Sequence, residues 1–237
     1  MSLGSLLSVA RNALTAQQAA IQTTSHNIAN AQTAGFSRQR PELSTNYPLV
    51  MSFGSVGTGV QIANITRARD SFLDTSFRRE AASTEGYGMT HDLMSEIEAI
   101  MNEPSDTALA STLDAFWNSW ADLSNNPGSV IAQGVVKQRG TQVAYMFNTN
   151  ATRIAETVSR SRDRLVQNVN EVNGLTDKVA ILNAEILGVE ASGNQAPDLR
   201  DQRDRLADQL SQLGVSRTEI QKDGTLSVYI GGISLVS

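Results

Sequence analysis

The sequence contains no cysteine and only two histidines, and it is poor in aromatic residues. Without a thiol the chain forms no disulfide, no thiolate metal site and no cysteine nucleophile. Because aromatic side chains are scarce, a core must consist mainly of Leu, Ile, Val, Ala and Met. No apolar run approaches the roughly 18 residues of a membrane-spanning helix, so the sequence predicts no membrane segment.

Charge is limited as well, since charged residues make up 18% of the chain and 24 acidic side chains outnumber 19 basic ones. The net charge of −5 argues against a nucleic-acid-binding protein, which needs basic side chains for phosphates. The N-terminus lacks the basic start, apolar run and small-residue cleavage site of a secretory signal. The length of 237 residues suits one large domain or two modest ones.

The first feature that is present is a heptad-like pattern over residues 3–28. Apolar or small residues recur there at spacings of four and three: Leu3, Leu7, Ala10, Leu14, Gln17, Ile21, Thr24 and Ile28. This spacing predicts a helix with a narrow seam that needs a partner. Through Gly35 its only charge is Arg11, whereas a solvated helix would carry more. We interpret it as a helix packed closely in an assembly; packing within its own domain and contact with a membrane surface are the alternatives.

Because this seam is narrow and we expect no partner for it in the same chain, we expect residues 1–30 to be disordered in an isolated monomer. Glycine and proline then break the pattern over residues 30–65, which we interpret as an extended, turn-rich connector. Residues 57–62 superficially resemble a phosphate-binding loop. They lack its third glycine and its Lys-Ser/Thr pair, so a turn is the better interpretation.

Helical periodicity returns in four segments. These are residues 67–104, with interruptions at Gly86 and Gly88, then 105–123, 154–189 and 199–213. Ser105 and Asp106 offer an N-cap to the second segment, and we expect its Trp117 and Trp120 in the core. The Asp and Arg residues between 198 and 208 stand three and four apart, as on the solvated surface of a stabilised helix.

The segment 154–189 has the strongest heptad pattern in the chain. Its seam includes Leu165, Val172, Val179 and Ile186. We expect the seam to be buried against the segments 105–123 and 199–213 of the same subunit, because their apolar faces also need cover. Beyond 213 the pattern changes to three short strands, at 215–220, 225–230 and 233–236, separated by Asp-Gly and Gly-Gly turns. The sequence thus predicts a mainly α fold with a small C-terminal β-sheet.

Catalytic constellations are not recognisable in the sequence. His26 has no acidic neighbours, and His91 lies beside Asp92 on a predicted helix, which does not direct both side chains at one metal. The acidic residues from Glu96 to Glu103 fit a solvated helix face better than a paired acid–base site. We therefore expect no catalytic residue, no metal site and no cofactor.

Residues 27–40 read NIANAQTAGFSRQR and resemble the opening signature of bacterial flagellar axial proteins. Within that superfamily the chain resembles the flagellar hook-associated protein 1 family. The segments that carry this resemblance are GTGVQIANITRARDSFLD at 57–74, LDAFWNSWADLSNNPGS at 113–129, DLRDQRDRLADQLSQLGV at 198–215 and KDGTLSVYIGGISLV at 222–236. Members of this family are longer, so the resemblance implies further outer domains and a C-terminal helix beyond this sequence.

The resemblance implies a structural subunit at the junction between hook and filament. The implied layout is an inner-tube helix at 1–35, a connector at 36–66, a helical bundle at 67–213 and a β-hairpin region at 214–237. The residues expected at the assembly interface are Leu3, Leu7, Leu14, Ile21 and Ile28 of the helix, and Asn27, Asn30, Gly35 and Phe36 of the motif.

The implied partners are identical subunits, the hook protein and the next junction protein, with neither nucleic acid nor membrane. The implied location is the extracellular flagellum, reached by the flagellar type III export route without a cleaved signal. One alternative is another axial subunit of the hook, rod or flagellin type, although hook proteins become β-rich soon after this motif and flagellins usually lack it. A cytosolic coiled-coil adaptor is a second alternative that would not explain the uncharged N-terminus.

Overall fold

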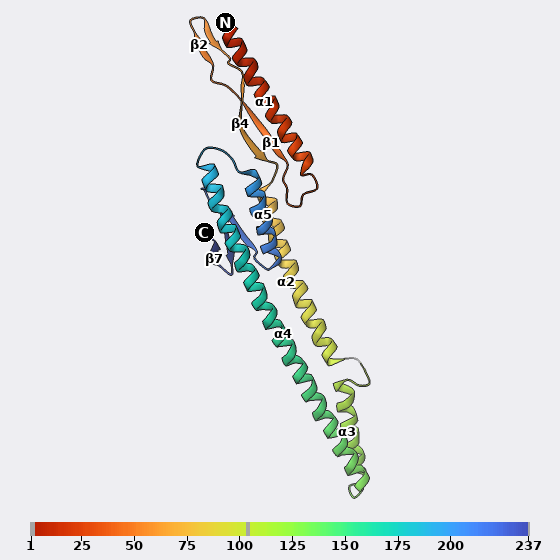
Figure 1. Ribbon diagram of the computed structural model, residues 1–237. Helices are drawn as coiled ribbons and strands as arrows, with labels where there is room; N and C mark the ends of the chain where they lie inside the picture. Colours follow the sequence, from red (N-terminus) through yellow and green to blue (C-terminus); the bar gives the residue numbers. More distant parts are fainter. Residues whose placement is uncertain (1–2, 103–104, 237) are drawn as a thin grey trace. The chain divides into compact units, whose positions relative to one another are not determined.

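The computed structural model describes residues 3–102 and 105–236 (Figure 1). The five helices of this part are α1 (Leu3–Ala29), α2 (Ser71–Met101), α3 (Leu109–Asn125), α4 (Val130–Glu190) and α5 (Pro197–Gln212). Its strands are β1 (Gln39–Thr45), β2 (Leu49–Met51), β3 (Gly54–Val56), β4 (Val60–Arg67), β5 (Arg217–Ile220), β6 (Leu226–Ile230) and β7 (Ile233–Val236). The mainly α fold with a small C-terminal sheet is confirmed.

The chain forms two compact units, one made of residues 1–83 and 172–237 and the other of residues 84–171. Both α2 and α4 pass from one unit into the other, and α4 alone is 61 residues long. Gly86 and Gly88, where interruptions were expected, lie inside α2 without breaking it. The four-part layout inferred from the sequence stays a prediction.

The first unit contains an apolar core between α4, α5 and the C-terminal sheet. Its buried residues are Val172, Leu175, Val179, Ala207, Leu210, Val215, Leu226, Val228 and Val236. Strands β5, β6 and β7 form an antiparallel meander in that order, as the two turn signals predicted. Asn183 of α4 attaches the sheet, because its amide accepts from the N–H of Leu226 and donates to the carbonyl oxygen of the same residue, each at 3.0 Å.

The segment expected as an extended connector is extended, but it is paired into strands. β1 and β4 form an antiparallel ladder from Gln39 opposite Arg67 to Thr45 opposite Val60, with a bulge after Glu42. β2 and β3 form a second short ladder. The sequence did not predict this pairing; Ser52 and Phe53 form the turn between β2 and β3, and Gly54 begins β3.

The second unit corrects two expectations for α3. Trp117 is 63% exposed and Trp120 is 48% exposed, so neither tryptophan lies in a core. The face that α3 buries consists of small residues, Thr112 and Ser119, while Phe116 lies against Gly140 of α4. Small side chains let two helices approach closely and leave the larger tryptophans outside the contact. The helix also begins after Ala108 without a side-chain cap, not at Ser105 or Asp106.

The long seam of α4 is buried only in part. Val172, Val179 and Ile186 are at most 7% exposed, whereas Leu165 is 63% exposed, contrary to expectation. Val172 and Val179 belong to the core that α4 forms with α5 and the sheet, as expected for the segment 199–213. The expected cover from α3 is absent because Phe116 of α3 lies at Gly140, an earlier part of α4.

Candidate functional site

Helix α1 presents two faces of different chemistry. The five aliphatic side chains expected at an assembly interface are 65% to 80% exposed: Leu3, Leu7, Leu14, Ile21 and Ile28. Helix α1 lies beside β1 and β4 (Figure 1). The face opposite the aliphatic side chains is made of small residues, and Ala16 and Thr23 are buried there. Val9 packs closely against Gly59: a Cβ added to Gly59 would lie 3.3 Å from Cγ1 of Val9.

The inference that α1 has no partner within its own chain was therefore wrong for this second face. The sequence did contain a sign of this packing, namely the small uncharged residues opposite the seam. They were interpreted as contacts to other subunits, although part of this face packs on the chain's own hairpin. The aliphatic face, by contrast, stays largely exposed in the part of the chain that the structure describes.

The end of α1 is fastened to β1 by the asparagines of the motif. The side-chain amide of Asn27 donates to the carbonyl oxygen of Gln39 at 2.9 Å and accepts from its N–H at 2.8 Å. Asn30 donates to the backbone oxygen of His26 and accepts from the Thr33 hydroxyl. Both asparagines thus have a role inside the chain, and their expected role between subunits stays a prediction.

Gly35 and Phe36 of the motif lie against α5 and α1. Gly35 has a φ of +80°, and a Cβ there would lie 3.3 Å from Cβ of Arg205. The positive φ therefore favours glycine at this position, and a Cβ would in addition press on the Arg205 side chain. The ring of Phe36 meets the imidazole of His26 edge-on at 5.3 Å between centroids. An open groove of about 820 Å³ runs beside these residues and is also lined by Ile181 and Leu206.

His26, which has no acidic neighbour in the sequence, lies beside a carboxylate in the structure. Its Nε2 is 3.3 Å from Oδ1 of Asp198, the first acidic residue of α5. The same oxygen accepts a hydrogen bond of 2.6 Å from the side chain of Gln39. The sequence could not reveal this contact, because the residues that meet are more than 150 positions apart.

Three further carboxylates continue along α5, and we call Asp198, Asp201, Asp204 and Asp208 the α5 carboxylates. Asp201 accepts from the backbone N–H of Ser37 at 2.8 Å and from Nη1 of Arg67, also at 2.8 Å. The same Nη1 of Arg67 donates to Asp204 at 2.7 Å. The loop after α1 and the end of β4 are thereby both attached to α5.

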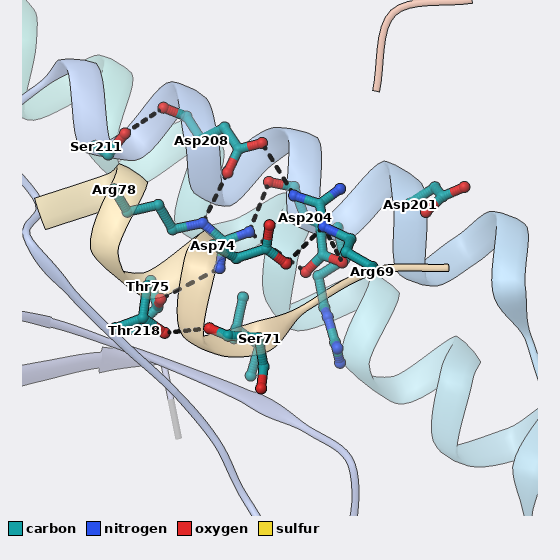
Figure 2. A network of polar contacts seen from close by, with 12 residues as sticks. Arg69, Ser71, Asp74, Thr75, Arg78, Asp201, Asp204, Asp208, Ser211 and Thr218 are labelled. Carbon is teal, nitrogen blue, oxygen red and sulfur yellow. Dashed lines mark hydrogen bonds and ion pairs between the residues drawn. The ribbon is translucent and has the colours of Figure 1, made fainter. Parts of the chain in front are cut away.

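Helix α2 and the turn before it are attached to Asp204 and Asp208 of α5 (Figure 2). Nε of Arg78 donates to Asp208 at 2.7 Å, and its Nη2 is 3.5 Å from Asp204. Nε of Arg69 donates to Asp74 at 2.6 Å, and its Nη2 lies 3.4 Å from Asp208. Burial lowers the pKa of Arg69, but the hydrogen bond to Asp74 and the surrounding carboxylates outweigh it and raise the pKa above its ordinary value.

This arrangement overturns the interpretation of residues 198–208 as a solvated helix surface. Asp201, Arg203 and Asp204 are at most 6% exposed. The ion pairs of the α5 carboxylates run to other elements and not along the helix. Burial alone would raise the pKa of Asp204, but the surrounding guanidinium groups, Arg67 first, hold it below its ordinary value.

The far side of α5 is attached to α4 and to the turn between β5 and β6. Arg200 makes a two-pronged pair with Glu190, at 2.8 and 2.7 Å, and this hydrogen bonding lowers the pKa of the Glu190 carboxyl. Arg203 is fully buried and donates to Asn183 and to the carbonyl oxygen of Gly224. Burial lowers the pKa of Arg203 to about 10.

Within residues 3–102 and 105–236, no group of three or more His, Asp or Glu side chains has the arrangement to hold a metal ion. His91 and Asp92 are both exposed neighbours on α2. None of the helices in these ranges is long and apolar enough to cross a membrane.

Two models of known protein families match parts of this chain. The family model described as the flagellar hook-associated protein FlgK helical domain matches residues 94–237. The chain belongs to the FlgK family. A model of the flagella basal body rod protein matches residues 7–36, the segment that includes most of α1 and the start of the motif.

Two relatives show how far the similarity to the FlgK family extends. Flagellar hook-associated protein 1 of Bacillus subtilis is 39% identical over 92% of this chain and 44% of its own length. The protein of the same name from Escherichia coli is 28% identical over 99% of this chain and 43% of its own length. The chain thus spans less than half the length of these relatives.

A solved structure supports the fold. The flagellar hook junction protein FlgK from Burkholderia pseudomallei matches 70% of this chain and 29% of its own chain, with a TM-score of 0.53 and 21% identity. The segments 57–74 and 198–215, which carry the family resemblance, also contact one another in this chain. Their Arg and Asp residues form ion pairs with one another across the two segments.

Proposed function

We propose that this chain is part of a structural subunit of the bacterial flagellum, which assembles with copies of itself at the junction between hook and filament. Membership of the FlgK family supports the location, and the exposed aliphatic face of α1 supports the assembly. In this role the chain is not an enzyme, and it transmits force through packing. The subunit is extracellular and leaves the cell by the flagellar type III export route without a cleaved signal.

The observation that carries this proposal is the unpartnered aliphatic face of α1. Its large side chains are exposed at a spacing of four and seven residues along an almost uncharged helix. Leaving such a stripe in water is unfavourable by about 25 cal/mol per Å² of apolar surface. Covering it with helices of neighbouring subunits removes that cost, so α1 belongs in the inner tube of the assembly.

The proposed partners are identical subunits, the hook protein on one side and the next junction protein on the other. A rod or hook subunit is the second candidate, favoured by the rod-protein match over residues 7–36. That match covers only the N-terminal segment. The long helices α4 and α5 lie within the FlgK match and favour the junction protein.

The experiment that tests this function changes the aliphatic face of α1 in the full-length protein. Ile21→Asp combined with Ile28→Asp should abolish incorporation at the hook tip, because a charge would be buried in a tightly packed seam. Electron microscopy of hooks and a motility assay report the result. A matched double variant with Ile21→Leu and Ile28→Leu keeps the face apolar and should assemble. Normal filaments from the Asp variant would remove α1 from the mechanism.

A further inference from the structure

The N-terminal arm, which we define as residues 3–68, is connected to the rest of its unit in an unusual way. Every hydrogen bond and ion pair observed between the described residues of the arm and α5 ends on a carboxylate. His26 and Gln39 bond to Asp198, Ser37 and Arg67 to Asp201, and Arg67 also to Asp204. We call this set of contacts the carboxylate joint.

The apolar core of the unit does not include the arm. The buried core residues come from α4, α5 and the C-terminal region beginning at Val215, and none from residues 3–68. The arm has its own packing between α1 and the β1–β4 hairpin, with Ala16 and Thr23 buried in it. Separating the arm from α5 would therefore leave both the core and the interior of the arm intact.

The chain passes between the arm and the core only once, at the short turn between β4 and α2. The N–H of Ala68 still bonds to Arg38 within the arm, at 2.8 Å. On the other side, Asp70 caps α2 by accepting from the N–H of Phe72 at 2.9 Å, and Arg78 holds α2 to Asp208. Residues 68–70, between these two attachments, are the covalent connection between the arm and the core.

The energetics of the carboxylate joint differ from those of an apolar contact. Removing one partner of a buried ion pair leaves a charge without compensation and is strongly unfavourable. Opening the whole joint instead returns both partners to water, where hydration offsets most of the lost pairing. Opening the whole joint therefore costs less free energy than removing one charged partner from the closed joint.

We propose that the carboxylate joint opens as one unit, so that the arm turns about residues 68–70 while the core stays folded, and that Asp201 controls this opening. Asp201 uses both oxygens, one for the loop at Ser37 and one for Arg67, and is itself 6% exposed. The device lets one fold present its α1 at more than one angle to a neighbouring subunit. It stands on the contacts alone and does not depend on the identity of that neighbour.

Three backbone amides distinguish opening of the joint from unfolding of the arm or of the core, because each donates to a side chain in one of these three regions. The Ser37 N–H donates to Asp201 across the joint, the Gln39 N–H to Asn27 inside the arm, and the Leu226 N–H to Asn183 in the core. Native-state hydrogen exchange on the 237-residue chain should show Ser37 exchanging at least about 10-fold faster than the other two, relative to their unstructured rates. Equal protection of Ser37 and Leu226 would overturn the proposal.

Variants test the role assigned to Asp201. Asp201→Asn has nearly the same shape but cannot accept from both donors, so Ser37 should exchange about 10- to 100-fold faster, with Leu226 unchanged. Asp177→Asn removes an exposed carboxylate of α4 and should leave all three amides as they are. If Asp201→Asn speeds Leu226 as much as Ser37, the joint and the core are one cooperative unit and the proposal is wrong. Added salt on the unmodified chain, which screens charges, should speed Ser37 more than Gln39; equal acceleration would also contradict it.

Discussion

Replacing Asp204 with asparagine should destabilise the unit that contains α5 more than its position on a charged helix suggests. Asp204 is 3% exposed and faces three cations, with Arg67 Nη1 at 2.7 Å, Arg78 Nη2 at 3.5 Å and Arg69 Nε at 3.8 Å. Asparagine keeps the shape and one acceptor but removes the charge that compensates these guanidinium groups. Uncompensated buried charge makes the expected loss of unfolding free energy about 3 kcal/mol.

The assay is urea unfolding followed by far-UV circular dichroism, with Asp177→Asn as the matched control on an exposed position of α4. The control should change the unfolding free energy by less than about 0.5 kcal/mol. If Asp204→Asn also costs less than about 1 kcal/mol, the network makes no net contribution to stability, as happens for ion pairs in water. The interpretation of segments 57–74 and 198–215 as mutually stabilising would then be refuted.

The contribution of Asp204 to the unfolding free energy should depend on pH, and the direction follows from its pKa. The pKa of Asp204 is lower in the folded chain than its ordinary value of 3.8, so its contribution is fully present above that value. The contribution is lost as the pH falls through the lower, folded-state pKa. The difference in unfolding free energy between the unmodified chain and Asp204→Asn should therefore be constant from neutral pH to about pH 5 and shrink towards about pH 2. A difference that grows on acidification would contradict the ion-pair geometry.

Further substitutions separate buried from exposed positions. Val179→Ala leaves a cavity at a fully buried site and should lower the unfolding free energy by about 1 to 3 kcal/mol, whereas Leu165→Ala at an exposed site of the same helix should change it by less than about 0.5 kcal/mol. Comparable losses would put Leu165 in a core. Gly35→Ala should cost about 1 to 2 kcal/mol, because φ is +80° and the added Cβ would press on the Arg205 side chain. Gly174→Ala, at an open position of α4, should stabilise the chain by up to about 1 kcal/mol. Thermal unfolding measures both glycine variants, and an unaffected Gly35→Ala chain would mean that the loop relaxes freely.

The sequence predicted elements with strong local signals well. Heptad spacing located most of α4, and the turns at Asp223-Gly224 and Gly231-Gly232 predicted the meander of β5 to β7. The prediction that the tryptophans of α3 are buried was wrong, because large apolar side chains become buried only where a partner is large enough to cover them. At Phe116 the partner offers Gly140, and only the small side chains Thr112 and Ser119 become buried.

The network on α5 could not be predicted for a different reason. Charges three and four apart on a helix predict a solvated surface when the sequence is considered locally. Asp201 and Asp204 instead pair with Arg67, more than 130 positions earlier, and only the fold brings these residues together. Both segments carry the family resemblance, but that resemblance did not reveal the contact between them. The aliphatic face of α1 could be predicted without knowledge of the fold, since the residue spacing alone indicated a seam that needs a partner.

Electron cryomicroscopy of flagella, focused on the boundary between hook and filament, tests the central claim most directly. With the full-length protein present, the map should contain a ring of these subunits at that boundary, with α1 in the inner layer. The side chains of Leu7, Leu14, Ile21 and Ile28, exposed in the single chain, should be covered by neighbouring helices. A boundary without this subunit, or one in which the aliphatic face of α1 stays in contact with water, would contradict the account.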